Sequence, residues 1–292
     1  MTLSQRHHYL PEVYLRGFTG EDGKLSVYDI KKKELKKGRF SPKQVFYEWN
    51  RNTFYANDNK TDFLENLYKD IDQKVTPTLK KLQVPFENPD LTPFEYFNLI
   101  FFLGVTYWRI PAIDNEITRH VITSDRKEIF IKLLNTETNE EVSDEIFDRV
   151  RNDKAFIESY RIPKAIIDYL KSNKNNLLEK WKITYSDRPP SLHLIGDNPI
   201  ITLDDQFENI LDTETIFPIS NHKLLWHLNS EYPEIISPET TVTIDQLIFL
   251  QSERYVCGPN GDYLNAIARL SDGPYNDNII KYLKDQTFGK IK

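Results

Sequence analysis

Residues Thr92–Arg109 read TPFEYFNLIFFLGVTYWR and carry the strongest helix signal in the chain. Thr92 has the side chain of an N-cap, Pro93 suits the first helical position, and Glu95 completes a capping box. In the rest of the segment, apolar side chains fall on almost every side of the predicted helix. A helix that is apolar all round is buried, so we expect this segment to be the central helix and Pro111 to end it or kink it.

The pattern of apolar residues changes on either side of this helix. Apolar residues recur every three or four positions from Phe63 to Leu82, and similar spacing continues in residues 112–180, which predicts further helices. Short apolar runs bounded by turn residues predict strands in residues 23–29 and 181–228. We therefore predict an α+β fold, in which N-terminal and C-terminal strands form a mixed sheet and the middle of the chain forms a helical lobe. The predicted organisation is a single domain, 1–292, with an α/β part (1–60 and 181–292) and a helical lobe (61–180).

Composition narrows the class of protein. The chain has 292 residues, of which 39% are hydrophobic and 28% charged, as is typical of a globular protein. Its single cysteine, Cys257, excludes an internal disulfide and a cysteine-rich zinc site. The first residues lack the features of a signal peptide, and the longest apolar run, Leu99–Val105, is too short to span a bilayer. We therefore expect a cytoplasmic protein with no membrane partner.

The charge is unevenly distributed along the chain. The net charge is −6, yet residues 1–60 contain 12 Lys and Arg against 7 Asp and Glu. The densest basic run lies in residues 31–39, where only Glu34 interrupts the positive charges. Such a run is a candidate for phosphate contacts, and its alternative interpretation is a solvated hairpin tip.

Two short motifs suggest a relationship to a known family. Residues 7–18 read HHYLPEVYLRGF, and residues 196–200 read GDNPI. Together they resemble the bacterial family catalogued as domain of unknown function 4238. That family has a His-His-Tyr-x-Pro-x-x-Tyr-Leu-Arg-x-Phe signature near its N-terminus and a Ser/Gly-Asp-Asn-Pro turn later in the chain. The resemblance covers most of the sequence and implies no particular activity.

The adjacent His7 and His8 are the first candidates for catalysis. Histidine exchanges protons near neutral pH, so either residue is a candidate general base, general acid or metal ligand. Neighbouring side chains diverge, and at most one of the two is expected to face a given site. We favour His8, because the nearby Pro11 restricts the local backbone. The alternative is a structural histidine that is hydrogen-bonded to the backbone.

The Asp197-Asn198-Pro199 turn provides a second candidate. Asp and Asn side chains bond to the nearby backbone in turns, so a structural role is the default interpretation. The functional alternative makes the Asp197 carboxylate catalytic, as a group that orients a base or holds a metal, and places Asn198 in the substrate site. We leave the need for a divalent metal open.

Four further residues are candidates for binding a substrate. Arg16, Arg51 and Arg109 each carry a guanidinium fork that suits phosphate or carboxylate. Asn52 takes the place of the middle residue in a comparison with His-Asn-His nucleases, although the third histidine of that motif is missing at the expected spacing. His120, on a predicted helix, is expected to be solvated.

No Gly-rich phosphate loop, Gly-x-Ser-x-Gly elbow or His-Glu-x-x-His motif is present. The leading hypothesis rests on the histidine pair, the basic N-terminal region and Asp197, and it is a nucleic-acid phosphodiesterase with a His/Asp site, a nuclease-like toxin or phage-defence effector. One alternative is a non-enzymatic interaction module whose N-terminal motif is a structural clasp. Another is an enzyme that acts on a small nucleotide ligand, which suits the acidic net charge better than long nucleic acid.

Overall fold

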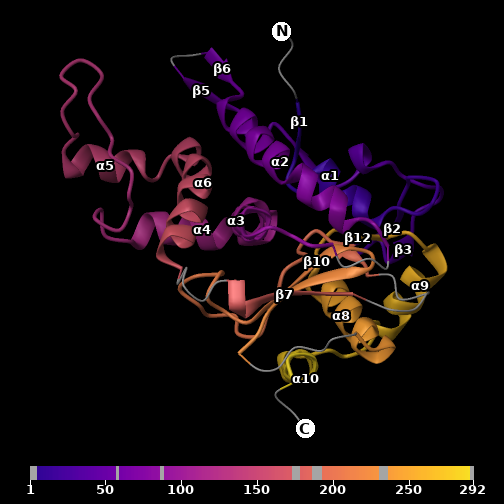
Figure 1. Ribbon diagram of the computed structural model, residues 1–292. Coiled ribbons are helices and arrows are strands. Elements are labelled where there is room, and N and C mark those ends of the chain that lie inside the picture. The colour runs from indigo at the N-terminus through magenta and orange to yellow at the C-terminus, as the bar shows by residue number, and fades with distance from the viewer. Residues whose placement is uncertain are drawn as a thin grey trace.

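The computed structural model describes residues 5–56, 59–85, 89–172, 178–185, 193–229 and 236–289. Figure 1 shows short N-terminal strands beside the long helix of residues 63–82, a group of helices from the middle of the chain, and strands and helices from its C-terminal part. The N-terminal elements are β1 (Arg6–His8), α1 (Glu12–Leu15), β2 (Ser26–Asp29), β3 (Glu34–Leu35), β4 (Tyr47–Trp49), β5 (Phe54–Ala56) and β6 (Asn59–Thr61). Short 3-10 turns lie at Arg16–Phe18, Pro42–Gln44 and Pro111–Ile113.

Helices dominate the middle of the chain, and strands return after them. The middle helices are α2 (Phe63–Leu82), α3 (Pro93–Arg109), α4 (Asp114–Thr123), α5 (Asp144–Val150) and α6 (Lys154–Lys171). The C-terminal elements are β7 (Trp181–Tyr185), β8 (Ile195–Gly196), β9 (Ile201–Thr202), β10 (Thr215–Ser220), β11 (Lys223–His227), α8 (Pro238–Gln251), β12 (Tyr255–Gly258), α9 (Gly261–Leu270) and α10 (Asp277–Thr287). The predicted α+β class with a helical middle is confirmed.

One sheet joins the two ends of the chain, as expected. Its strand order is β3-β2-β12-β8, and Cys257 of β12 lies between Val27 of β2 and Ile195 of β8. A second sheet has the order β7-β11-β10-β9, and two-stranded ribbons pair β1 with β4 and β5 with β6. All these pairs are antiparallel, so in the described residues the shared sheet is not mixed in strand direction.

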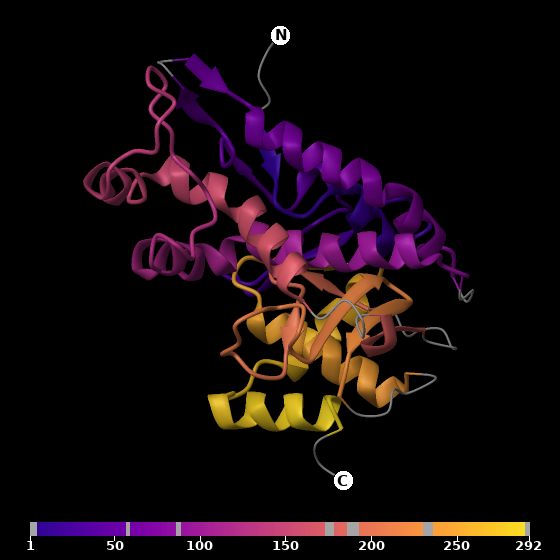
Figure 2. The same ribbon diagram turned by 60° about the vertical axis from the view of Figure 1, so that its left-hand side comes forward.

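The second sheet is covered on both faces. In β11, Leu224 and Trp226 belong to a cluster with residues of α8 and α9, whereas Leu225 packs with the cluster that contains α2, α3 and α6. Burial on both faces explains why β10 and β11 are apolar without strict alternation. In Figure 2 the gold and yellow helices α8 and α10 lie on the opposite side of the molecule from the purple helices α2 and α3.

Helix α3 is the expected central helix over its C-terminal half. Its residues are buried from Leu99 to Arg109 except for the half-buried Phe101, and the helix packs against α2 and α6. Its first turn is at the surface, where Phe94 is 72% exposed. None of the helices in the described part of the chain combines the length and apolar composition that a bilayer crossing requires. The predicted single-domain organisation stays a prediction.

The predicted capping box at the start of α3 is confirmed. The backbone N–H of Glu95 donates to Thr92 Oγ1, and the backbone N–H of Thr92 donates to a Glu95 carboxylate oxygen at 2.9 Å. We expect Thr92→Ala to lower the free energy of unfolding by about 1 kcal/mol, because one N-terminal amide loses its acceptor. Urea denaturation measures the change. The matched control is the exposed Thr136→Ala, and an equal loss in both variants would contradict a capping role.

Candidate functional site

His7 is a buried link between β1 and the loop after β4. The side chain is fully buried, and its Nδ1 accepts a hydrogen bond from the backbone N–H of Asn52 at 2.8 Å. The Asn52 side chain in turn donates to the carboxylate of Glu65 in α2 at 2.9 Å. These contacts tie the N-terminal ribbon to the long helix α2. They agree with the structural alternative for His7.

His8 lies on the other side of the same strand and is half-buried. Its ring lies 5.7 Å from that of Tyr47. Burial lowers the pKa of His8, with a smaller opposing effect from Glu12. Its buried Nε2 has no hydrogen-bond partner among the described residues. The choice of His8 as the functional histidine stays a prediction.

Asp197 holds the start of β12. Its carboxylate accepts hydrogen bonds from the backbone N–H groups of Glu253 and Arg254 at 3.0 and 2.8 Å. Burial raises the pKa of Asp197, and these two hydrogen bonds oppose the rise. The backbone carbonyl of the next residue, Asn198, accepts from the side chain of Gln251. In the described residues, no hydrogen bond joins Asp197 to His7 or His8.

This arrangement separates the two roles proposed for Asp197. We expect Asp197→Asn to lower the free energy of unfolding by about 1–3 kcal/mol, because an amide oxygen can accept both bonds less well than a carboxylate and its NH₂ group faces a donor. Urea denaturation measures the loss, with the exposed Asp204→Asn as the control. Unchanged stability would contradict the structural role.

The predicted substrate-binding arginines do not converge on one cleft. Arg51 is buried and pairs with Glu48 and Asp114 at 2.6 and 2.5 Å. Arg109 is buried and pairs with Asp72 at 3.0 Å, with its guanidinium 4.2 Å from the ring centre of Tyr68. Arg16 is exposed at the start of a 3-10 turn. Arg51 thus connects the β1–β4 ribbon to the helical lobe, and Arg109 connects two helices within the lobe.

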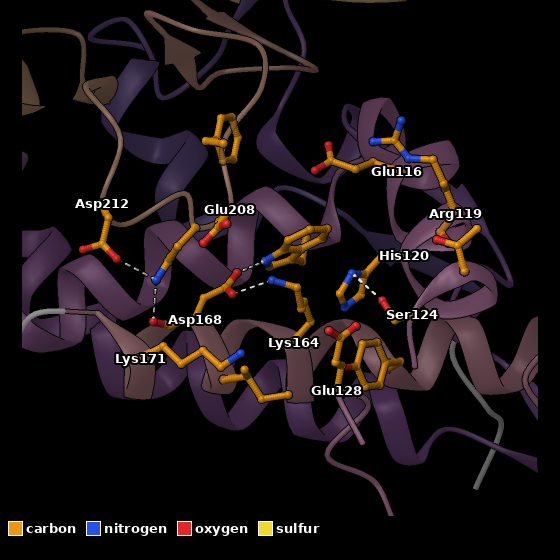
Figure 3. Close-up of a pocket in the computed structure, with 16 residues that line it drawn as sticks. Glu116, Arg119, His120, Ser124, Glu128, Lys164, Asp168, Lys171, Glu208 and Asp212 are labelled. Carbon is orange, nitrogen blue, oxygen red and sulfur yellow. Dashed lines mark hydrogen bonds and ion pairs between the residues drawn. The ribbon is translucent and has the colours of Figure 1, made fainter. Parts of the chain in front are cut away.

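A cavity of about 580 Å³ lies elsewhere, between α3, α4, α6 and the segment of residues 207–212. Figure 3 shows the polar side chains that line it, with His120 and Ser124 together and Lys164 directed to Asp168. The walls also contain the rings of three aromatic residues, Trp108, Tyr160 and Phe207. The cavity therefore combines aromatic walls with groups that can exchange protons.

His120 is the group in this cavity best suited to act as a base. Burial and the nearby positive charges of Lys164 and Lys171 lower its pKa to about 4, although Glu128 opposes them. Its imidazole is thus neutral at pH 7. The Ser124 hydroxyl lies 3.3 Å from Nδ1, which places a second group with an exchangeable proton against the ring. The ring stacks on Tyr160, with centres 5.9 Å apart, and this contact limits its orientation.

Tyr160, which packs on His120, has a buried hydroxyl that is unpartnered in the described part of the chain. Its side chain is 0% exposed, and its hydroxyl has no hydrogen-bond partner among the described residues. Burial raises its pKa to about 12, so the hydroxyl stays protonated at neutral pH. A buried hydroxyl without a partner is unfavourable. Tyr160 lines the cavity, and its hydroxyl is a buried polar group that no described residue satisfies.

Lys164 and Asp168 form a buried ion pair in the same cavity. The Lys164 ammonium lies 4.6 Å from the ring centre of Trp108, and the Trp108 Nε1–H donates to Asp168 at 2.7 Å. Burial raises the pKa of Asp168, and Lys164 opposes the rise. The contacts hold the ammonium in one position against the Asp168 carboxylate.

Charges of both signs surround the mouth of the cavity. Two of the cations are Arg119 and Lys171, and the carboxylates are Glu116, Glu128, Glu208 and Asp212. The Arg119 guanidinium has no ion-pair partner among the described residues. The described part of the chain contains no group of three or more His, Cys, Asp or Glu residues suited to a metal ion.

This cavity is not apparent from the sequence. His120 was expected to be solvated, whereas the structure shows it half-buried and stacked on Tyr160. The available signal was the four-residue spacing of His120 and Ser124, and of Lys164 and Asp168, which places each pair on one helix face. That spacing is also typical of ordinary helix surfaces. Only the packing of α4 against α6 shows that these side chains line a cavity.

A comparison with known families identifies the chain. The family model described as "Protein of unknown function (DUF4238)" matches residues 6–262. The chain belongs to this family. The DUF4238 match begins at the first residue of β1 and extends into α9, so it contains the N-terminal ribbon, the Asp197 turn and the cavity around His120. No curated protein sequence and no solved structure matches the chain.

Proposed function

We propose that this protein hydrolyses a phosphodiester bond in a small, nucleotide-sized ligand bound in the cavity around His120. The observation that carries the proposal is the neutral His120 ring stacked on Tyr160, whose buried hydroxyl lacks a partner. A neutral imidazole can accept a proton, and the contacts of the ring with Ser124 and Tyr160 limit its orientation. Lys164 supplies a fixed positive charge nearby.

The proposed step needs only water and the ligand. His120 takes a proton from a water molecule while the water oxygen forms a bond to phosphorus. The bond from phosphorus to the leaving oxygen breaks. The imidazolium then returns its proton to the leaving oxygen. A histidine with a lowered pKa is a weak base, but its protonated form is a strong acid, which favours this second transfer.

The charges at the mouth favour a small ligand over long nucleic acid. Carboxylates outnumber the cations there, and the whole chain has a net charge of −6. A polyanion would meet repulsion along its length, whereas a single phosphodiester needs only local positive charge. The acidic mouth therefore supports the nucleotide-sized substrate rather than the nucleic-acid phosphodiesterase of the leading sequence hypothesis.

The N-terminal clasp is compatible with this proposal. The hydrogen bonds of His7 and Asp197 to backbone groups support structural roles for these two residues. A clasp at one place and a reactive cavity at another can coexist in the same chain. A structural clasp by itself gives no reason for the cavity around His120 or for its unpartnered buried hydroxyl.

The test is a substrate panel for the purified protein. It contains bis(4-nitrophenyl) phosphate, 2′,3′- and 3′,5′-cyclic nucleotides, dinucleotides, and long single-stranded RNA and DNA, each with EDTA, Mg²⁺ or Mn²⁺. We expect turnover of one or more small phosphodiesters and much slower cleavage of the long chains. Preferred cleavage of long nucleic acid would contradict the small substrate, and no turnover of any member would contradict phosphodiester hydrolysis.

A further inference from the structure

The ribbon of β1 and β4 presents a cation and two aromatic rings together. Arg6 pairs with Trp49 across the ribbon, and its guanidinium lies 5.1 Å from the ring centres of both Trp49 and Tyr47. Trp49 is nevertheless 57% exposed. An exposed tryptophan costs hydrophobic free energy unless a partner covers it, and indole rings serve as stacking surfaces for planar ligands.

The backbone on both sides of β4 is held in an uncommon conformation. Phe46 and Asn50, the residues immediately before and after the strand, have φ values of +53° and +55°. Asparagine tolerates this left-handed region, but a bulky residue such as Phe46 adopts it at an energetic cost. Phe46 is buried, so packing holds the strand in the orientation that exposes Trp49.

A hollow of about 460 Å³ adjoins these rings. It is lined by Tyr47, Glu48, Trp49, Asn50, Arg51, Asp114, Lys154, Glu158 and Arg254. Each of its three carboxylates is already paired with arginine. Glu48 pairs with Arg51 and Arg254, and Asp114 and Glu158 both pair with Arg161.

Positive charge is in excess at this place. The hollow, together with Arg161, which pairs with two of its carboxylates, contains four Lys and Arg side chains against three carboxylates. Lys154 has no ion-pair partner among the described residues and lies at the first position of α6. A local positive excess in a chain of net charge −6 favours an anionic ligand at this surface.

We propose that the ribbon and the adjoining hollow form a second binding site, which takes a nucleobase with an attached phosphate. The base stacks on the exposed part of Trp49, and the phosphate lies in the hollow near Lys154. The paired carboxylates keep the arginines in place without cancelling the charge of Lys154. A free nucleotide and a single-stranded nucleic acid both offer this chemistry. The site is separate from the cavity around His120 and does not depend on hydrolysis there.

Acrylamide quenching provides a readout for this site, and any change that persists in Trp49→Phe comes from the other tryptophans, including Trp108 in the cavity around His120. The remaining tryptophans, Trp108, Trp181 and Trp226, are all buried, so Trp49 dominates quenching of tryptophan emission by acrylamide. The probes are AMP and a single-stranded oligoadenylate. We expect either probe to protect the emission from acrylamide, and the part of this protection that is lost in Trp49→Phe belongs to the ribbon. Absence of protection at millimolar AMP and at micromolar oligoadenylate would overturn the proposal.

Substitutions at Trp49 test the stacking contact. With fluorescein-labelled oligoadenylate or labelled AMP, Trp49→Ala is expected to weaken binding on the order of tenfold, because a stacked base is lost. Trp49→Phe retains an aromatic face and should retain most of the affinity. The matched control is Phe94→Ala, which removes another exposed aromatic ring at the start of α3. Equal binding by the wild type and Trp49→Ala would overturn the stacking contact.

Lys154→Glu tests the phosphate contact and the source of the ligand. A glutamate at the first turn of α6 suits the helix dipole, so the variant is expected to fold. We expect it to weaken binding and to reduce the salt dependence for oligoadenylate, whereas Lys182→Glu, with the same change in net charge, leaves both unchanged. Much tighter binding of oligoadenylate than of AMP identifies single-stranded nucleic acid as the ligand, and equal affinities identify the free nucleotide. Identical effects of Lys154→Glu and Lys182→Glu would overturn the proposed phosphate position.

Discussion

Replacing His120 with glutamine is expected to lower kcat/KM for phosphodiester hydrolysis by about 10²- to 10⁴-fold, the usual contribution of a positioned general base. Glutamine keeps the size and polarity of the side chain but cannot accept a proton at neutral pH. Because His120 is half-buried and has no described ion pair, we expect the free energy of unfolding to change little. The substrate is whichever small phosphodiester the panel identifies, and the initial rate is the measurement.

His222 is the matched control for this variant. Burial also lowers its pKa to about 4, but it lies next to β11 and outside the cavity. His222→Gln should therefore keep the activity of the folded protein, whatever it does to stability. Equal rates for the wild type and His120→Gln would show that His120 is not the base.

The lowered pKa of His120 also predicts the pH dependence. Activity that needs the neutral ring should fall as the pH drops through about 4, rather than through the ordinary value of 6.5. For stability, the unfolded chain binds the proton of this histidine more readily than the folded chain, so the contribution is complete above pH 6.5 and declines as the pH falls toward 4. His120→Gln should make the loss of stability in this window shallower. An acid limb of kcat/KM near 6.5 would contradict a buried, neutral base.

Replacing Arg161 with alanine is expected to lower the free energy of unfolding by about 3–5 kcal/mol, as for other buried ion pairs that lose one partner. Arg161 is 2% exposed, and its guanidinium donates to Glu158, to Asp114 and to the backbone carbonyl of Trp108, each at 2.7 Å. Removing it leaves a buried carboxylate and a buried carbonyl without their donor. It also releases the contact between α6 and the end of α3.

Urea denaturation measures this loss. The control is Lys33→Ala, because Lys33 and Asp272 form an ion pair whose side chains are 78% and 74% exposed. Exposed ion pairs contribute little to the free energy of unfolding, because solvation of the charges and loss of side-chain entropy offset their attraction. A small loss for Arg161→Ala, similar to that for Lys33→Ala, would show that water replaces the buried guanidinium.

Elements whose causes are local could be predicted from the amino-acid sequence alone. The capping box at Thr92, the apolar surface of α3 and the amphipathic pattern of α2 each depend on residues a few positions apart, and all are present in the structure. The α+β class could be predicted because apolar residues with the spacing of strands and apolar residues with the spacing of helices occupy separate parts of the chain. The family signature at His7 and His8 was also visible as sequence.

The roles of the polar residues depend on tertiary contacts. His7 and Asp197 became acceptors for backbone N–H groups of Asn52 and Arg254, positions 45 and 57 residues away. His120 acquired its low pKa from burial and from Lys164 in another helix. A side chain's hydrogen bonds, charge neighbours and exposure depend on segments distant in sequence, which local periodicity does not encode. The cavity around His120 and the exposed Trp49 therefore emerged only when α4 packed on α6 and β1 paired with β4.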